Sequence, residues 1–216
     1  MTNISRNQKK LGIRRELRDA AEKALQENGW RVTKPAGTGK SSIRKIERDG
    51  KSMLVSIRTT QDQWIAFPRL QDDSGWGTLP DIDAVVASSV DDIDEPTEAL
   101  VHLLDGDEMR DRFQRTYDAR KAAGYTQPPG RGVWISLYEK EQAEPPTKVG
   151  AGAGLKHPPI ARLPLETGGG GTVPATPAAS PSSPEPEPQI TIPEAKRRLA
   201  AAFGVEPENV KITIEG

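Results

Sequence analysis

The stretch from Ser42 to Arg69, SIRKIERDGKSMLVSIRTTQDQWIAFPR, constrains the fold more than any other part of the chain. It is centred on Asp49-Gly50, two residues that readily take the positive φ angles of a two-residue hairpin turn. After the turn the side chains alternate with a period of two, so Met53, Val55 and Ile57 fall on one strand face and Leu54, Ser56 and Arg58 on the other. The stretch predicts a β-hairpin followed by a third strand over Trp64 to Phe67.

A helix is expected before the hairpin, from about Arg6 to Glu27. Apolar residues repeat there at helical spacing, and Asn28-Gly29 suits the left-handed exit from a helix. The apolar positions are Ile13, Leu17, Ala20, Ala21, Ala24 and Leu25. This pattern predicts that one face of the helix packs on the sheet.

Two further strands and a helix are expected after the hairpin. Consecutive apolar residues in Ile82 to Ser88 predict a strand buried on both faces, and Ala99 to Leu104 predicts another. Asp105 can cap a helix that ends at Gly124, because Glu108 three residues on resembles a capping box. A last, peripheral strand is expected over Gly132 to Tyr138. The order predicts an α+β or α/β domain over residues 1–140, with a mixed central sheet flanked by helices.

The composition changes after residue 140. Gly, Pro, Ala, Ser and Thr dominate residues 141–189, which predicts a disordered linker that buries too little apolar surface to fold. Residues 190–216 regain apolar periodicity and predict a small β-α-β attachment unit, too short for a core of its own. We expect that unit to bind a protein partner, to self-associate or to dock on the main domain.

The chain has no cysteine and no apolar run of about 20 residues. These features predict a soluble cytoplasmic protein without a membrane partner. The net charge of −1 hides an asymmetry: residues 1–58 carry fifteen Lys or Arg against six Asp or Glu, whereas residues 59–116 carry four against fourteen. The basic third could face phosphate, or it could neutralise the acidic middle within the molecule. Nucleic-acid contacts are expected at Arg14, Arg15, Arg18, Lys45 and Arg58.

Catalytic motifs are sparse. His102 lies inside an apolar segment and is expected to be a hydrogen-bonded strand residue, not a base or a metal ligand. Neither a metal-binding HExxH spacing nor a GxSxG nucleophile elbow occurs. No catalytic residue is therefore assigned from motifs.

With VSIRTTQDQW at its centre, the element order from about Arg6 to Tyr138 resembles the restriction-endonuclease-like, PD-(D/E)XK, superfamily. The resemblance places Ser56 where that family has an acidic residue and Arg58 where it has lysine, followed by Thr59, Thr60 and Trp64. It leaves Glu47 or Asp49 as the upstream acid of a divalent-metal site. Because a serine hydroxyl cannot replace a carboxylate on Mg²⁺, and because arginine stays protonated, the site is expected to be degenerate.

The sequence leaves three functions open. The first is a non-catalytic, nuclease-like domain that binds DNA or RNA weakly, in which Arg58 holds a phosphate and no cofactor is needed. The second is a protein interaction or regulatory module without a nucleic-acid role, in which Arg58 pairs with an acid of the middle segment. The third is an active nuclease, which alone would require Mg²⁺.

Overall fold

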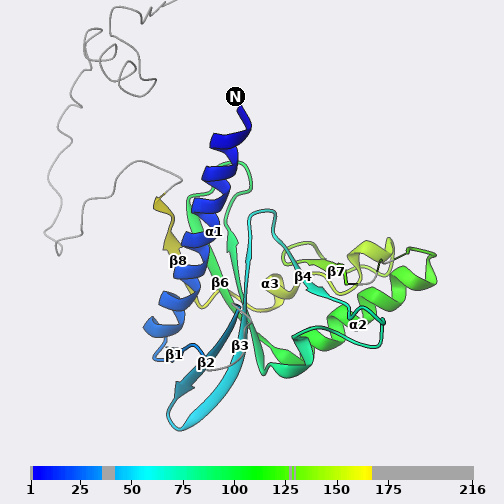
Figure 1. Cartoon of the computed structure of the whole chain (residues 1–216), viewed down its shortest axis with the longest axis horizontal. Helices are drawn as coiled ribbons and strands as arrows, with labels where there is room; N and C mark the ends of the chain where they lie inside the picture. Colours follow the sequence, from blue (N-terminus) through cyan, green and yellow to red (C-terminus); the bar gives the residue numbers. More distant parts are fainter. Residues whose placement is uncertain (1, 36–41, 127, 129, 167–216) are drawn as a thin grey trace, which may run out of the picture. The chain divides into compact units, whose positions relative to one another are not determined.

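The structure is a computed structural model that describes residues 2–35, 42–126, 128 and 130–166 (Figure 1). The predicted β-α-β unit over 190–216 and the linker residues from 167 onward lie outside these residues. Within the described part, no helix is long and apolar enough to cross a membrane. The described chain is an α+β domain built on one six-stranded mixed sheet.

The six strands lie in the order β1-β2-β3-β5-β6-β8. Neighbouring strands are antiparallel except β3 and β5, which are parallel. Their bounds are β1 Arg31–Thr33, β2 Ile43–Arg48, β3 Lys51–Thr60, β5 Ala84–Val90, β6 Glu98–Asp105 and β8 Ala161–Pro164. The expected mixed central sheet is therefore confirmed.

The predicted hairpin forms the β2–β3 pair. Asp49 and Gly50 have φ angles of 50° and 77°, as a hairpin turn of this length requires. Ile43, the first residue of β2, lies opposite Ser56. The end of β3, from Arg58 to Thr60, therefore extends past the start of β2 and has no β2 residue beside it.

Separate layers cover the two faces of the sheet (Figure 1). Helix α1 (Thr2–Glu27) lies along one face, and its expected apolar positions are all buried against β3, β5 and β6. The other face packs against α2 (Gly106–Ala122) and a two-stranded sheet of β4 (Trp64–Pro68) and β7 (Gly132–Ser136). A short 3₁₀ helix, η1 (Leu79–Asp81), precedes β5.

The predicted third strand and the predicted peripheral strand both exist, but they pair with each other. β4 leaves the main sheet after β3, and β5 takes the place beside β3. All seven residues of β5 are buried, as a central strand requires, whereas β4 alternates between buried and half-buried side chains. β4 and β7 therefore form a small separate sheet, and its apolar face packs on the main sheet. The expectation that β7 is the last strand is wrong, because β8 follows it.

Helix α2 begins as expected. The Asp105 side chain accepts a hydrogen bond of 2.9 Å from the backbone N–H of Glu108. The backbone N–H of Gly106 donates to the carbonyl of Asp83, and a Cβ on Gly106 would lie 2.6 Å from that oxygen. Only glycine allows the helix to start this close to the β5 entry.

The predicted linker is wrong over residues 141–166, which pack on the domain. They form the short helices η2 (Pro146–Lys148) and α3 (Ala153–Lys156) and then strand β8, which pairs with β6. Ala151, Ala153 and Leu165 are buried there. Composition indicated too little apolar surface for folding, but this segment adds its few apolar side chains to a core that already exists.

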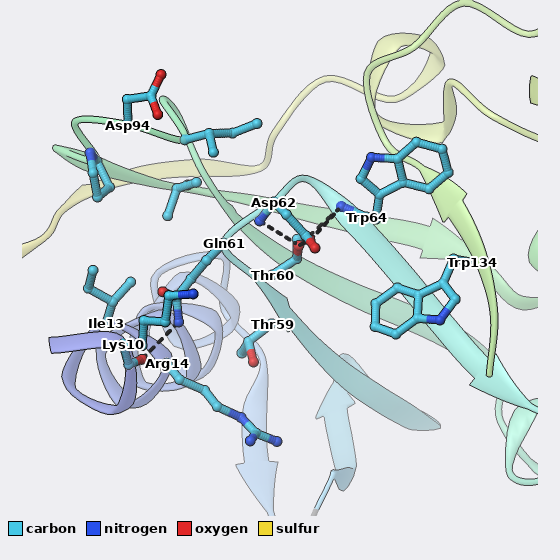
Figure 2. Close-up of a pocket in the computed structure, with 13 residues that line it drawn as sticks. Lys10, Ile13, Arg14, Thr59, Thr60, Gln61, Asp62, Trp64, Asp94 and Trp134 are labelled. Atoms are coloured by element: carbon cyan, nitrogen blue, oxygen red, sulfur yellow. Dashed lines mark hydrogen bonds between the residues drawn. The ribbon is translucent and has the colours of Figure 1, made fainter. Parts of the chain in front are cut away.

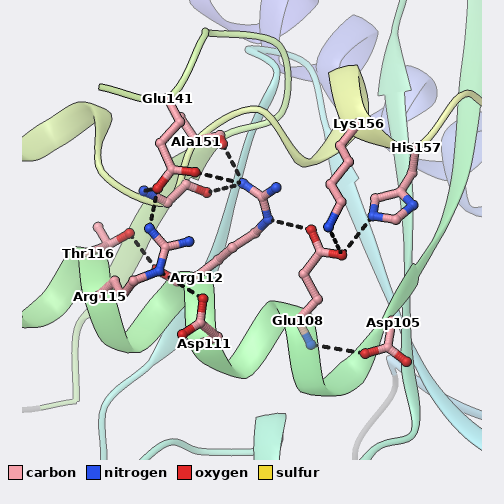
Figure 3. A network of polar contacts seen from close by, with 11 residues as sticks. Asp105, Glu108, Asp111, Arg112, Arg115, Thr116, Glu141, Ala151, Lys156 and His157 are labelled. Carbon is pink, nitrogen blue, oxygen red and sulfur yellow. Dashed lines mark hydrogen bonds and ion pairs between the residues drawn. The ribbon is translucent and has the colours of Figure 1, made fainter. Parts of the chain in front are cut away.

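Polar contacts with α2 hold the same segment in place (Figure 3). The Arg112 guanidinium is 7% exposed, pairs with Glu108 at 2.8 Å, and donates to the carbonyls of Gly150 and Ala151. Glu108 also accepts from Lys156 at 2.9 Å and from His157 at 2.8 Å. Arg112 and Glu108 together therefore bind residues 150–157 to the helix.

Candidate nucleic-acid interface

A groove lies between α1, the end of β3 and the β4–β7 pair. It consists of two adjoining hollows of about 330 Å³ and 720 Å³. Arg14, Thr59, Trp64 and Trp134 line both hollows, so the two form one continuous depression. We call these the arginine hollow and the larger hollow.

Three arginines from two elements line the arginine hollow. Arg14 and Arg18 lie one helical turn apart on α1, and Arg58 comes from β3. None of the three forms an ion pair with a described residue. The hollow therefore concentrates positive charge without a carboxylate among its lining residues.

Arg58 is the most constrained of these arginines. Its guanidinium carbon lies 4.0 Å from the centroid of the Phe67 ring, and its Nε is buried without a hydrogen-bond partner in the described part of the chain. Burial lowers the pKa of Arg58 to about 10, so the side chain is still charged at neutral pH. The expected alternative, a pairing of Arg58 with the acidic middle, is not found among the described residues.

The turn between β3 and β4 fixes one wall of the groove (Figure 2). The Thr60 hydroxyl donates to Asp62 at 2.7 Å and accepts from the backbone N–H of Trp64 at 3.1 Å. The Gln61 amide donates to the carbonyl of Lys10 at 2.8 Å, which ties this turn to α1. The backbone positions on both sides of the groove are therefore held by hydrogen bonds.

Two tryptophans stand on the outer face of the β4–β7 pair (Figure 2). Ala66 lies opposite Trp134 in the register, so Trp64 is a diagonal neighbour of Trp134 on the same face. Trp134 is 48% exposed, and Arg120 donates to its backbone carbonyl at 2.6 Å. Neither indole N–H has a hydrogen-bond partner among described residues. The pair presents two indoles to the groove.

The larger hollow is less basic than the arginine hollow. Lys10 and Arg14 line it together with Asp62 and Asp94 (Figure 2). The Asp62 carboxylate accepts from Thr60, which holds it at the turn. Carboxylates therefore line only the larger hollow, where Lys10 and Arg14 accompany them, and the described lining of the arginine hollow has none.

The structure brings some of the predicted nucleic-acid contacts together and separates others. Arg14, Arg18 and Arg58 share the arginine hollow. Arg15 is exposed on α1 but does not line the groove, and Lys45 pairs with Glu47 at 2.5 Å. The predicted cluster is therefore reduced to three of its five members.

The two acids of the predicted degenerate nuclease site, Glu47 and Asp49, do not meet Ser56 and Arg58, which are neighbours on one face of β3. Ser56 is fully buried, and its hydroxyl has no partner among described residues. Glu47 lies opposite Ser52, four residues or roughly 13 Å along the hairpin from Ser56. Asp49 is in the turn, with its side chain 93% exposed. No group of three His, Cys, Asp or Glu residues suited to a metal occurs in the described ranges.

The expectation that His102 is a hydrogen-bonded strand residue is confirmed. The residue is fully buried in β6, where its Nδ1 donates to the carbonyl of His157 at 2.7 Å. Its Nε2 then accepts from the Tyr138 hydroxyl at 2.9 Å. Burial lowers the pKa of His102, which favours this neutral, doubly bonded ring.

Sequence reasoning did not assign Lys10, Thr59, Trp64 or Trp134 to this site. Thr59 and Trp64 were named only as residues that follow Arg58 in the family pattern, and Trp64 also as the start of a strand. Trp134 carries a usable signal, because it alternates with Val133 and Ile135, which are both buried. Trp134 therefore falls on the face of β7 that points away from the core, where it can line a surface.

Comparisons with known proteins add no identification. No protein-family model, no curated protein and no solved structure matches the chain. The geometry and chemistry of the groove are therefore what indicate a function for this chain.

Proposed function

We propose that this chain is a nucleic-acid-binding protein that holds backbone phosphates in the arginine hollow and does not cleave them. The observation that carries the proposal is the convergence of Arg14, Arg18 and Arg58 on one hollow without an ion pair to any described residue. Guanidinium groups bind phosphate oxygens in a bidentate manner, which makes phosphate a suitable ligand for such a cluster.

The energetics of the cluster support an anionic ligand. Arg14 and Arg18 are like charges one turn apart, an arrangement that weakly destabilises a helix. Arg58 is partly removed from water, with an aromatic ring but no carboxylate near its guanidinium. A bound phosphate would supply the missing counter-charge to all three side chains.

The proposal includes a non-catalytic relationship to the restriction-endonuclease-like superfamily. A mixed sheet with α1 on one face and a β2–β3 hairpin supports it at the level of element order. On this proposal Ser56 and Arg58 correspond to the family's acid and lysine, and Glu47 and Asp49, the candidate upstream acids, lie far from them along the hairpin. We therefore expect no cleavage of plasmid or RNA in Mg²⁺ or Mn²⁺. Cleavage that disappears in Glu47→Ala or Asp49→Ala protein would restore the enzyme interpretation.

The binding test measures fluorescence anisotropy of labelled single-stranded and duplex oligonucleotides, in DNA and RNA form, at two salt concentrations. The wild-type affinity should fall as salt rises, by a log–log slope of about −0.7 per phosphate contact for a single strand and −0.9 for a duplex. Arg58→Ala and Arg14→Ala should each weaken binding roughly tenfold or more, because a charge-assisted hydrogen bond contributes about 1.5–3 kcal/mol. Both variants should also flatten the salt slope.

Arg15→Ala is the matched control, since Arg15 lies on the same helix and is exposed but does not line the groove. It should retain wild-type affinity within about twofold. Equal losses from Arg15→Ala and Arg14→Ala would show that binding depends on total charge and not on the hollow. An absence of binding to all four oligonucleotides at low salt, with binding to an acidic peptide, would favour the protein interaction module instead.

A further inference from the structure

Two of the four tryptophans in this chain lie in the groove, and two lie in the interior. Trp30 and Trp76 are 7% and 9% exposed, and each has a defined partner: Arg48 stacks over Trp30, and the Trp76 N–H donates to Gln114 at 3.0 Å. Trp134 is 48% exposed, and no aromatic or hydrogen-bonding partner within the described chain contacts its indole. The interior pair is explained by packing, and the groove pair is not.

We infer that the groove selects single-stranded nucleic acid, with one unstacked base against Trp134 and the adjoining phosphate on Arg14, Arg18 and Arg58. This inference rests on the proposed function, because it names the form of nucleic acid that the same groove accepts. It gives Trp134 a role in binding a base, which the binding of phosphate alone does not require.

Trp134 lies in the same groove as the three arginines. Trp134 lines both hollows, as does Arg14, so an aromatic surface and an unpaired guanidinium are present in one depression. A nucleotide carries its phosphate and its base as neighbouring groups. A base on Trp134 therefore leaves its own phosphate within the arginine hollow.

The two hollows also differ in the charge of their lining residues. Asp62 and Asp94 line the larger hollow beside Lys10 and Arg14, so that hollow attracts a phosphate less than the arginine hollow, which has three arginines and no acid in the described part of its lining. Every base has an N–H group, on an exocyclic amine or on the ring, that can donate to a carboxylate, and the faces of the bases are uncharged. The larger hollow therefore suits a base better than a phosphate, and the arginine hollow suits a phosphate, which gives the bound nucleotide one orientation.

Trp64 and Trp134 stand on strands whose backbones are held in place. Hydrogen bonds to Thr60 and from Arg120 fix the backbones of Trp64 and Trp134, and Ile65 and Ile135 bury the opposite face of the β4–β7 pair. An indole on a fixed strand loses little freedom when a base stacks on it. Bases of an intact duplex are already stacked on each other and cannot reach such a surface, whereas those of a single strand can.

The test uses the full chain with four labelled or competing probes of the same length. These are a single-stranded oligothymidine, a duplex containing it, an abasic single strand and inorganic polyphosphate. The wild-type protein should bind the oligothymidine at least fivefold more tightly than the other three, and its tryptophan fluorescence should be quenched only by probes that carry accessible bases. Trp134→Ala should lose roughly 5- to 100-fold in affinity for the oligothymidine and less than twofold for polyphosphate.

Two further variants separate stacking from damage to the fold. Trp134→Phe keeps an aromatic face and should recover most of the lost affinity. Tyr125→Ala removes another exposed aromatic, 55% exposed and outside the groove, and should have no effect. Equal wild-type affinity for all four probes, with Trp134→Ala unchanged, would overturn the inference and leave the phosphate-binding proposal intact. An absence of binding to every probe would overturn both.

Discussion

Arginines serve two different purposes on the two sides of this molecule. On α2, Arg112 and Arg115 are surrounded by acceptors: Arg112 contacts Glu108, Glu141 and two backbone carbonyls, and Arg115 contacts Asp111 and Glu141 (Figure 3). At the groove, Arg14, Arg18 and Arg58 form no ion pair with the described chain. The same side chain stabilises the fold in the first region and, on our proposal, binds a ligand in the second.

The difference lies in the partners of the arginines and not in their charge alone. A buried ion pair is costly to break because the remaining group stays buried without a counter-charge. An unpaired, partly buried arginine is itself costly, because part of its hydration is lost without compensation. Loss of the contacts on α2 should therefore lower the free energy of unfolding, whereas removal of an unpaired arginine from the groove should raise it.

The largest expected effect comes from removing the segment that supplies the acceptors on the α2 side. A chain that ends at Gln142 lacks β8, the buried Ala153 and Leu165, and the carbonyls that Arg112 contacts. We expect it to lose cooperative thermal unfolding as followed by circular dichroism. A chain that ends at Glu166 retains all of these contacts and is the control. Equal unfolding midpoints for the two chains would show that residues 143–166 act as a linker after all.

Arg112→Ala should be the most damaging single substitution of the comparison. It leaves Glu108 without one of its donors and two buried carbonyls without a partner. We expect a loss of about 3 kcal/mol in the free energy of unfolding, or roughly 6–12 °C in Tm. Arg15→Ala, on the exposed side of α1, should change Tm by about 1 °C or less. A loss below about 1 kcal/mol for Arg112→Ala would contradict the structural role.

Glu108 should make the stability of the α2 side depend on pH. Burial by itself would raise the pKa of Glu108, but hydrogen bonds from Lys156, Arg112 and His157 outweigh it and lower the pKa to about 2. An acid whose folded pKa is depressed stabilises the fold above its unfolded pKa of about 4.5, and this contribution is lost as pH falls from there toward 2.

We therefore expect Glu108→Gln to lower the free energy of unfolding at pH 7 by about 2 kcal/mol. The variant should also show a shallower decline below pH 4.5 than the wild type in urea titrations. Asp107→Asn is the control, because Asp107 is adjacent and 90% exposed. Parallel pH profiles for wild type and Glu108→Gln would contradict the role of the Glu108 carboxylate.

The smallest expected change in the free energy of unfolding is a gain, at Arg58 in the groove. Arg58→Met removes a partly desolvated charge and keeps an apolar side chain beside Phe67, so we expect a gain of about 1 kcal/mol in the free energy of unfolding. The same variant should bind oligonucleotides at least tenfold more weakly. Thermal unfolding and anisotropy on one preparation would measure both. A loss of stability would show that the contact of Arg58 with Phe67 outweighs its desolvation.

Local patterns predicted most elements of the fold. The Asp49-Gly50 turn, the apolar face of α1 and the cap at Asp105 are all decided within a few residues, and each is confirmed. The pairing of β4 with β7 could not be read in the same way, because it joins segments that are far apart in sequence. Residues 141–166 were misassigned because composition does not show that a core and the Arg112 side chain are already in place to receive them.

The candidate site was predictable only in part for the same reason. The basic charge of residues 1–58 indicated Arg14 and Arg18, together with Arg15, and the period of two identified the strand face of Arg58. The meeting of the three groove arginines with Trp134 depends on the tertiary position of the β4–β7 pair over the end of β3. Neither the absence of ion pairs among the described residues nor the difference in charge between the two hollows has a local sequence signal.

The close approach of backbone to backbone at two glycines has a consequence for the divergence of this chain over evolution. A Cβ on Gly106 would lie 2.6 Å from the carbonyl oxygen of Asp83, and one on Gly150 would lie 2.5 Å from that of Arg112. Both contacts are with main chain, which cannot turn aside as a side chain can. Descendants of the same ancestor could exchange nearly every surface residue, yet we expect them to keep glycine at these two positions. Paired in this way, the two glycines would mark distant relatives that overall identity no longer reveals.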